Sequence, residues 1–120
     1  MLNLDTHMLV ALLDGSLAPR EEALVLEEPL AISDIVLWEL AKLVQLGRLE
    51  LDLDSATFAK VLARLTVIPI SPAIATMSTR LDFESDLADE LIAATSLVEG
   101  IPLLTRDRRI RRSKIVPLAR

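Results

Sequence analysis

The chain has 120 residues, 52% of them hydrophobic, and a formal net charge of −5. This length suits one domain, and no apolar run approaches the roughly 20 residues that a membrane-spanning helix needs. The absence of cysteine excludes disulfides, zinc-thiolate sites and cysteine nucleophiles. With one histidine, a metal site must rely on oxygen ligands, which favours magnesium or manganese. Asp5 and His7 interrupt the apolar stretch of any signal peptide, so we expect a cytoplasmic protein without membrane association.

Strands and helices are predicted to alternate along the chain. Helix starts are indicated by capping residues and by proline at a first turn, and helix ends by glycine. In chain order the predicted elements are a strand at 1–5, a helix at 7–14 capped by Thr6, a helix opening at Pro19, a strand at 30–32, a helix capped by Ser33 or Asp34 and ending at 46, a helix from 54 or 55 to about 65, a strand at 66–70, a helix from 72 to about 81, a loop at 82–86, a helix at 88–99, a strand at 103–104 and an edge strand at 115–118.

Such alternation is typical of crossover units, in which a helix connects two parallel strands. The sequence therefore predicts an α/β fold of three layers, with a mostly parallel sheet and helices on both faces, over residues 1–120 as a single domain. Asp5 and Asp107 each follow a predicted strand, and open α/β sheets bind ligands outside the carboxyl ends of their strands.

Two further acids belong to predicted helices, and each has a structural and a functional interpretation. Glu39 shares a narrow polar stripe with Lys42 and Gln45, so it either faces solvent or needs a cation as partner. Asp89 either complements the dipole of its helix or acts in a site, and Asp86 is the alternative acid one turn earlier. If all four meet, their mutual repulsion favours a divalent metal, as in sites that cleave phosphodiesters.

Positive charge is concentrated at the end of the chain. Residues 106–120 carry seven Arg or Lys side chains against Asp107 alone, or +6, which leaves −11 for the other 105 residues. A charge run of this kind is most often a solvated face, but on an acidic body it favours an anion-binding edge.

The motifs together resemble one family. They are Leu4-Asp5-Thr6-His7, residues 32–33 with 37–41, residues 86–89 with 91–95, and residues 100–107. In this order and spacing they resemble the PIN domain, and among PIN domains the VapC-type ribonuclease toxins of toxin–antitoxin pairs. The resemblance covers essentially the whole chain.

This resemblance implies a magnesium- or manganese-dependent endoribonuclease that forms a homodimer and is neutralised by an antitoxin. It implies catalytic and metal-binding roles for Asp5, Glu39, Asp89 and Asp107, with Thr6 and Thr105 as flanking polar positions. RNA phosphates would then be contacted by basic residues of the last segment, namely Arg106, Arg108, Arg109, Arg111 and Arg112. The chain departs from the family at Glu90, where arginine is frequent. His7 is interpreted as a residue that packs or that supports the ligands from behind, and not as a ligand itself.

Two alternatives belong to other classes. A receiver-like signalling module also places acids at strand ends, but it needs a paired acid after the first strand and a late lysine, and neither is present. A degenerate PIN module would bind a partner without nuclease activity; the complete acidic quartet argues against it, and Glu90 argues mildly for it. The high hydrophobic fraction fits either an aliphatic core or a surface buried under a partner.

Overall fold

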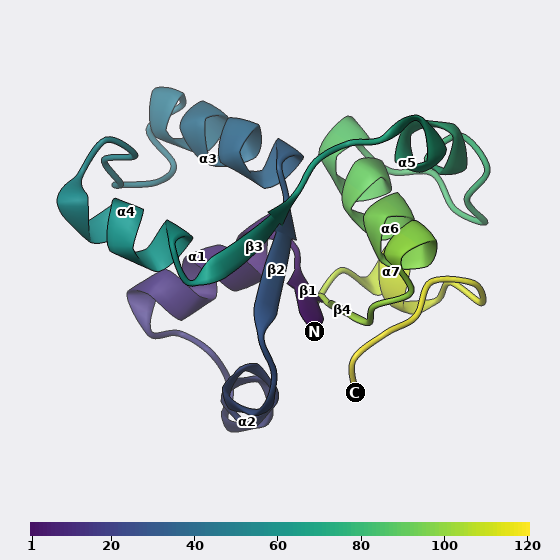
Figure 1. Cartoon of the computed structure of the whole chain (residues 1–120), viewed down its shortest axis with the longest axis horizontal. Coiled ribbons are helices and arrows are strands. Elements are labelled where there is room, and N and C mark those ends of the chain that lie inside the picture. The colour runs from purple at the N-terminus through teal and green to yellow at the C-terminus, as the bar shows by residue number, and fades with distance from the viewer.

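A four-stranded parallel sheet runs through the middle of the molecule in the computed structural model, which describes residues 1–120 (Figure 1). Its strands are β1 (Leu2–Leu4), β2 (Leu30–Ser33), β3 (Leu65–Ile68) and β4 (Leu103–Leu104). Seven helices connect or follow them: α1 (Thr6–Asp14), α2 (Pro19–Glu27), α3 (Ile35–Gln45), α4 (Ala56–Leu62), α5 (Pro72–Met77), α6 (Leu87–Glu99) and α7 (Arg108–Arg111). Figure 1 shows α1, α3 and α4 on one side of the sheet and α5 and α6 on the other. The predicted α/β fold with helices on both faces is confirmed.

The strand order β3-β2-β1-β4 determines where a ligand can lie. From β1 the chain first moves outward through β2 and β3, and then returns to place β4 on the other free side of β1. The direction of winding therefore reverses between β1 and β4. In open parallel sheets the loops that leave two such strands diverge and form a crevice at the carboxyl ends.

The strands are short because both faces of the sheet are covered. Leu2 and Leu4 of β1 and the pair Leu103 and Leu104 of β4 have no more than 1% of their surface exposed. Continuous burial suits parallel strands, whose sequences read as apolar runs rather than as alternating patterns. The largest core cluster combines all layers and comprises Leu2, Leu4, Met8, Leu9, Ile32, Val36, Leu40, Phe58, Ile92, Ala93, Leu103, Leu104, Ile110, Val116 and Ala119.

Capping explains most helix starts. The hydroxyls of Ser55 and Ser71 each accept a hydrogen bond of 3.1 Å from the backbone N–H three residues later, which begins α4 and α5. Glycine marks a helix end in turn: Gly100, which follows the last residue of α6, adopts φ +66°, a left-handed conformation that glycine tolerates best. None of the helices is both long enough and apolar enough to cross a membrane.

Several predicted boundaries were wrong. Asp5, not Thr6, caps α1, and Thr6 is its first residue. The helix predicted to reach residue 81 ends at Met77, and the strand predicted at 66–70 occupies Leu65–Ile68. The edge strand predicted at 115–118 is reduced to one parallel bridge between Leu103 and Leu118. The short helix α7 was not predicted, because its sequence is almost entirely basic and resembles a solvated tail.

Candidate active site

The crevice between the ends of β1 and β4 is lined only by polar side chains. Asp5 follows β1, Asp107 follows β4, and Asp89 reaches the same place from the first turn of α6. Together with His7 and Arg106 they line a hollow of 310 Å³ without a hydrophobic residue. Three of the four acids expected at the site are thus neighbours, although they lie up to 102 positions apart in the sequence.

Asp5 is the most deeply buried of these acids, with 4% of its surface exposed. One of its oxygens, Oδ1, accepts a hydrogen bond of 2.8 Å from the Met8 amide, which caps α1. Burial raises the pKa of the Asp5 carboxyl, while hydrogen bonds from Thr105 and Met8 lower it. The raised pKa means that the protein alone does not fully compensate a charge at this position.

Asp89 has the largest upward pKa shift. Burial raises the pKa of Asp89 from 3.8 to about 6, and the negative charge of Asp86 adds to the shift. Repulsion from Asp107 and Glu39 raises the pKa further, while the Ser85 hydroxyl, which donates a 3.0 Å hydrogen bond to Oδ2, lowers it. The negative charges of Asp107 and Glu39 therefore both contribute to the raised pKa of Asp89.

Asp107 has a double function in the local structure. Its Oδ1 accepts a hydrogen bond of 3.0 Å from the Ile110 amide and caps α7. Its own amide donates to the Thr105 hydroxyl at 3.0 Å. Thr105 thus lies between Asp5 and Asp107 and orders the turn that carries the second acid.

Glu39, on α3, is the expected acid that the structure does not bring into this crevice, since it lines a different hollow between α3 and α6. It is half-buried, and its Oε1 is sealed from solvent without any hydrogen-bond partner. Lys42, the nearest base on the polar stripe, instead donates to Gln45 Oε1 at 3.1 Å. A buried carboxylate oxygen without a hydrogen-bond partner is energetically costly, so Glu39 lacks a donor or cation at Oε1.

These side chains fit a hard divalent cation in their chemistry. Their donors are carboxylate and hydroxyl oxygens, which magnesium and manganese prefer, and both the raised pKa values and the unpartnered Glu39 oxygen indicate negative charge that lacks a counter-ion. As the side chains stand, no group of three or more His, Asp or Glu is close enough to hold one ion. Binding an ion would therefore require these carboxylates to turn inward.

Comparison with known proteins identifies the family. Residues 3–115 match the PIN domain. The chain belongs to the PIN domain family. Over 87 residues it is 34% identical to a protein named Ribonuclease VapC22 from Mycobacterium tuberculosis, an alignment that covers 70% of this chain and 67% of the relative.

Solved structures show the same fold. A toxin–antitoxin complex from Klebsiella pneumoniae contains a chain that superposes with a TM-score of 0.75 at 21% identity, covering 99% of this chain and 97% of that one. A chain of VapBC2 from Rickettsia felis, bound to promoter DNA, gives a TM-score of 0.74 at 22% identity, with 99% and 98% covered. At these identities the likeness demonstrates a shared PIN fold.

A charge clamp that sequence analysis missed holds Arg106 at the rim of this PIN domain. Its Nη2 and Nε donate to the two carboxylate oxygens of Glu21 at 2.6 and 2.8 Å, and Nη2 also contacts the Ser16 carbonyl at 3.1 Å. Glu21 is 4% exposed, and the paired guanidinium lowers its pKa from 4.5 to about 2. Arg106 therefore links the α1–α2 connection to the site-bearing turn.

Replacing Glu21 with glutamine should destabilise the protein by roughly 1 to 2 kcal/mol at neutral pH, a value reduced for solvent screening because Arg106 is half exposed. Because the native pKa lies below the ordinary one, this contribution is present above pH 4.5 and is lost as the pH falls toward 2. Urea unfolding between pH 3 and 7 would measure it. Glu22→Gln, an exposed neighbour, is the matched control; equal stability of the two variants at pH 7 would contradict a stabilising clamp.

Residues 106–120 form a basic segment, and four of its other arginines differ in whether hydrogen bonds to the protein hold them. Arg109 donates to the Glu84 carbonyl at 2.7 Å, and Arg111 donates to the Thr105 carbonyl at 3.2 Å, so both brace neighbouring loops. Arg108 and Arg112 are exposed and belong to neither of the two ion pairs in the chain. They are the side chains of this segment that are most available to an external anion.

Three other positions complete the comparison with the sequence. Thr6 is buried with its hydroxyl unpartnered, and His7 is exposed and lines the hollow, where its charge lowers the pKa of Asp5. Glu90, the departure from the family pattern, accepts a hydrogen bond of 3.2 Å from the Ser85 amide. It thereby fixes the loop whose Ser85 hydroxyl contacts Asp89, a role that the sequence did not reveal.

Proposed function

We propose that this PIN domain is a metal-dependent endoribonuclease that hydrolyses RNA phosphodiester bonds, and that it is the toxin of a toxin–antitoxin pair. The observation that carries the proposal is the shared crevice of Asp5, Asp89 and Asp107, in which Asp89 has a pKa of about 6. Carboxylates with perturbed pKa values, placed where the direction of winding of a parallel sheet reverses, are a physical signature of a functional site. The relative named Ribonuclease VapC22 supports the choice of RNA.

In this mechanism Asp5, Asp89 and Asp107 would hold one or two magnesium or manganese ions. A bound ion supplies positive charge against the negative charge that develops on the phosphodiester. Glu39, whose charge raises the pKa of Asp89, would turn its buried carboxylate toward the crevice and complete the shell of the ion or orient the attacking water. Thr105 keeps Asp107 in place, because its hydroxyl accepts a hydrogen bond of 3.0 Å from the Asp107 amide. Thr6, which follows Asp5, has a buried hydroxyl without a partner.

RNA phosphates would be contacted from the basic segment. Exposed Arg108 and Arg112 supply the primary contacts, and Arg109 and Arg111 contribute charge while bracing their loops. Arg106 is held by Glu21, so its share is the residual positive potential at the rim rather than a free guanidinium.

The proposed partners are an antitoxin protein and a second copy of the chain. Apolar side chains from α1, α2 and β3 border a hollow of 380 Å³, and Leu26 beside it is 78% exposed. Exposed apolar surface of this kind is characteristic of protein interfaces. The solved complexes with a similar fold support an antitoxin as one occupant.

The proposal is tested by incubating the purified, partner-free protein with single-stranded RNA. Cleavage should occur with manganese or magnesium, stop with EDTA and resume when the metal is restored. Purified Asp5→Asn protein is the control for contaminating nucleases, because the substitution removes one charge and changes little volume. Equal cleavage by wild type and Asp5→Asn would refute the site assignment.

A binding module without nuclease activity is the second candidate, and one observation favours it. No three acidic or histidine side chains approach closely enough to hold an ion as they stand. This module would bind its partner normally but leave RNA intact at every metal concentration, so the same incubation distinguishes the two functions.

A further inference from the structure

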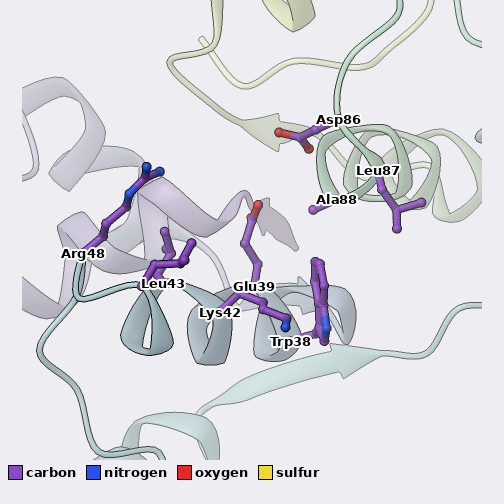
Figure 2. A pocket seen from close by; sticks show the side chains of 9 residues that line it. Trp38, Glu39, Lys42, Leu43, Arg48, Asp86, Leu87 and Ala88 are labelled. Atoms are coloured by element: carbon purple, nitrogen blue, oxygen red, sulfur yellow. The ribbon is translucent and has the colours of Figure 1, made fainter.

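A second hollow lies beside the acidic crevice, and Glu39 is the only residue of its lining that the nuclease mechanism uses. Its volume is 280 Å³, and it lies between α3 and the start of α6. Figure 2 shows Trp38 and Glu39 rising from α3 toward Asp86, Leu87 and Ala88, with Arg48 at the other side of the opening. Glu39 lines this hollow, and its charge raises the pKa of Asp89 in the acidic crevice.

The walls of the hollow expose apolar surface that a folded protein normally buries. Trp38 is 48% exposed, Leu46 is 63% exposed and Leu87 is 61% exposed. Trp38 is the only tryptophan of a chain that has no tyrosine and two phenylalanines. A large flat ring left accessible beside a candidate active site offers a stacking surface.

Positive charge accompanies this ring. The Lys42 ammonium lies 5.9 Å from the centre of the Trp38 ring and makes no ion pair, since it contacts only the neutral Gln45 side chain. Arg48 is exposed at the rim and also makes no ion pair. An aromatic face with unpaired cations beside it complements a nucleotide, which combines a flat base with an anionic phosphate.

The hollow is close enough to the acids to serve the same ligand. Asp86, which lines this hollow, accepts a hydrogen bond of 2.9 Å from the amide of Asp89, which lines the acidic crevice, so the two hollows meet across one turn of α6. An RNA strand whose phosphate lies at the carboxylates would therefore place a neighbouring nucleotide over Trp38.

The geometry points to a nucleobase subsite: an unpaired base next to the scissile phosphate stacks on Trp38, while Lys42 and Arg48 contact its flanking phosphates. This inference rests on the proposed function and deepens it, because it assigns one base beside the scissile phosphate to the Trp38 ring. In duplex RNA the bases are stacked on each other, so none is available to the ring.

The single tryptophan makes the subsite directly measurable. Titrating the protein with a short single-stranded RNA in EDTA, where binding needs no catalysis, should quench the Trp38 emission. An RNA that lacks the base at one position should quench less when that position is the stacked one. Equal quenching by intact RNA and by every abasic RNA of the series would overturn the inference.

Kinetics with manganese provide the second measurement. Trp38→Leu should raise KM about tenfold, equivalent to about 1.4 kcal/mol, and leave kcat nearly unchanged. Trp38→Phe should restore most of the loss because it keeps a stacking ring. The abasic position that weakens wild type should have no further effect on Trp38→Leu. Val98→Ala, an exposed apolar residue near the end of α6 that lines none of the hollows, is the matched control for lost exposed surface.

Each outcome separates this inference from the nuclease proposal. Normal KM in Trp38→Leu with active cleavage would refute the subsite alone, whereas a lack of cleavage in all proteins would refute the nuclease and leave the emission titration to decide the subsite. If the emission changes with an apolar peptide but not with RNA, the hollow is a protein-docking site and the inference is wrong.

Discussion

Replacing Asp89 with asparagine should lower RNA cleavage by at least about a thousandfold, because loss of one ligand charge removes several kcal/mol of electrostatic stabilisation at a metal-dependent site. The same substitution should stabilise the metal-free protein. Burial and neighbouring carboxylates raise the pKa of Asp89 to about 6, so ionising it at neutral pH costs folding free energy. After allowance for solvent screening we expect a gain of about 2 kcal/mol at pH 7.

The raised pKa of Asp89 makes the free energy of unfolding fall as the pH rises. A carboxyl whose pKa is raised from 3.8 to about 6 stabilises the native state below pH 3.8, and this contribution is lost as the pH rises to 6. Denaturant unfolding of the metal-free protein should therefore show a decrease in stability across this window that is smaller in Asp89→Asn, where only the raised pKa of Asp5 still contributes. Glu50→Gln, an exposed acid outside the site, controls for net charge. The prediction fails if both variants follow the wild-type pH profile.

Manganese should raise the thermal midpoint by roughly 10 °C relative to EDTA at equal ionic strength. A ligand that binds only the native state contributes about 2.7 kcal/mol at a hundredfold excess over its Kd, and each kcal/mol moves the midpoint of a protein of this size by about 4 °C. The expected cause is relief of the repulsion among Asp5, Asp89 and Asp107.

The choice of variants in this experiment follows from capping. Asp5 and Asp107 cap α1 and α7 with one carboxylate oxygen each, and asparagine preserves this function while alanine does not. Asp5→Asn should therefore melt cooperatively yet lose most of the manganese shift. Identical midpoints of the wild type with manganese and with EDTA would instead favour the non-catalytic module.

The order of the elements was predictable because strong local signals accompany it. Pro19, Gly100 and the serines at 55 and 71 mark helix ends, and apolar runs mark the strands. The convergence of Asp5 and Asp107 follows from topology, since both leave parallel strands in the same direction. Boundaries were less accurate, as at β3, because neighbouring apolar residues fit either a strand or the loop beside it.

The environment of each acid could not be predicted from sequence. Glu39 lies on a helix that packs against α6, and the local sequence does not reveal that its Oε1 is buried without a partner. The bond between Glu21 and Arg106 joins residues 85 positions apart, and no local pattern indicates such a pair. Both depend on tertiary packing, which propensity and periodicity do not encode.

The β4 edge of the sheet is protected by hydrogen bonds to residues 117–119. Along β4 the backbone groups of Leu103 are occupied, since its amide donates to the Pro117 carbonyl and its carbonyl accepts from the Ala119 amide, both at 2.9 Å. A foreign strand thus finds no free hydrogen-bonding groups at Leu103, two positions from Thr105 and four from Asp107. Edge strands are where misassembly begins, and here the edge nearest the carboxylates is closed by the chain's own last residues.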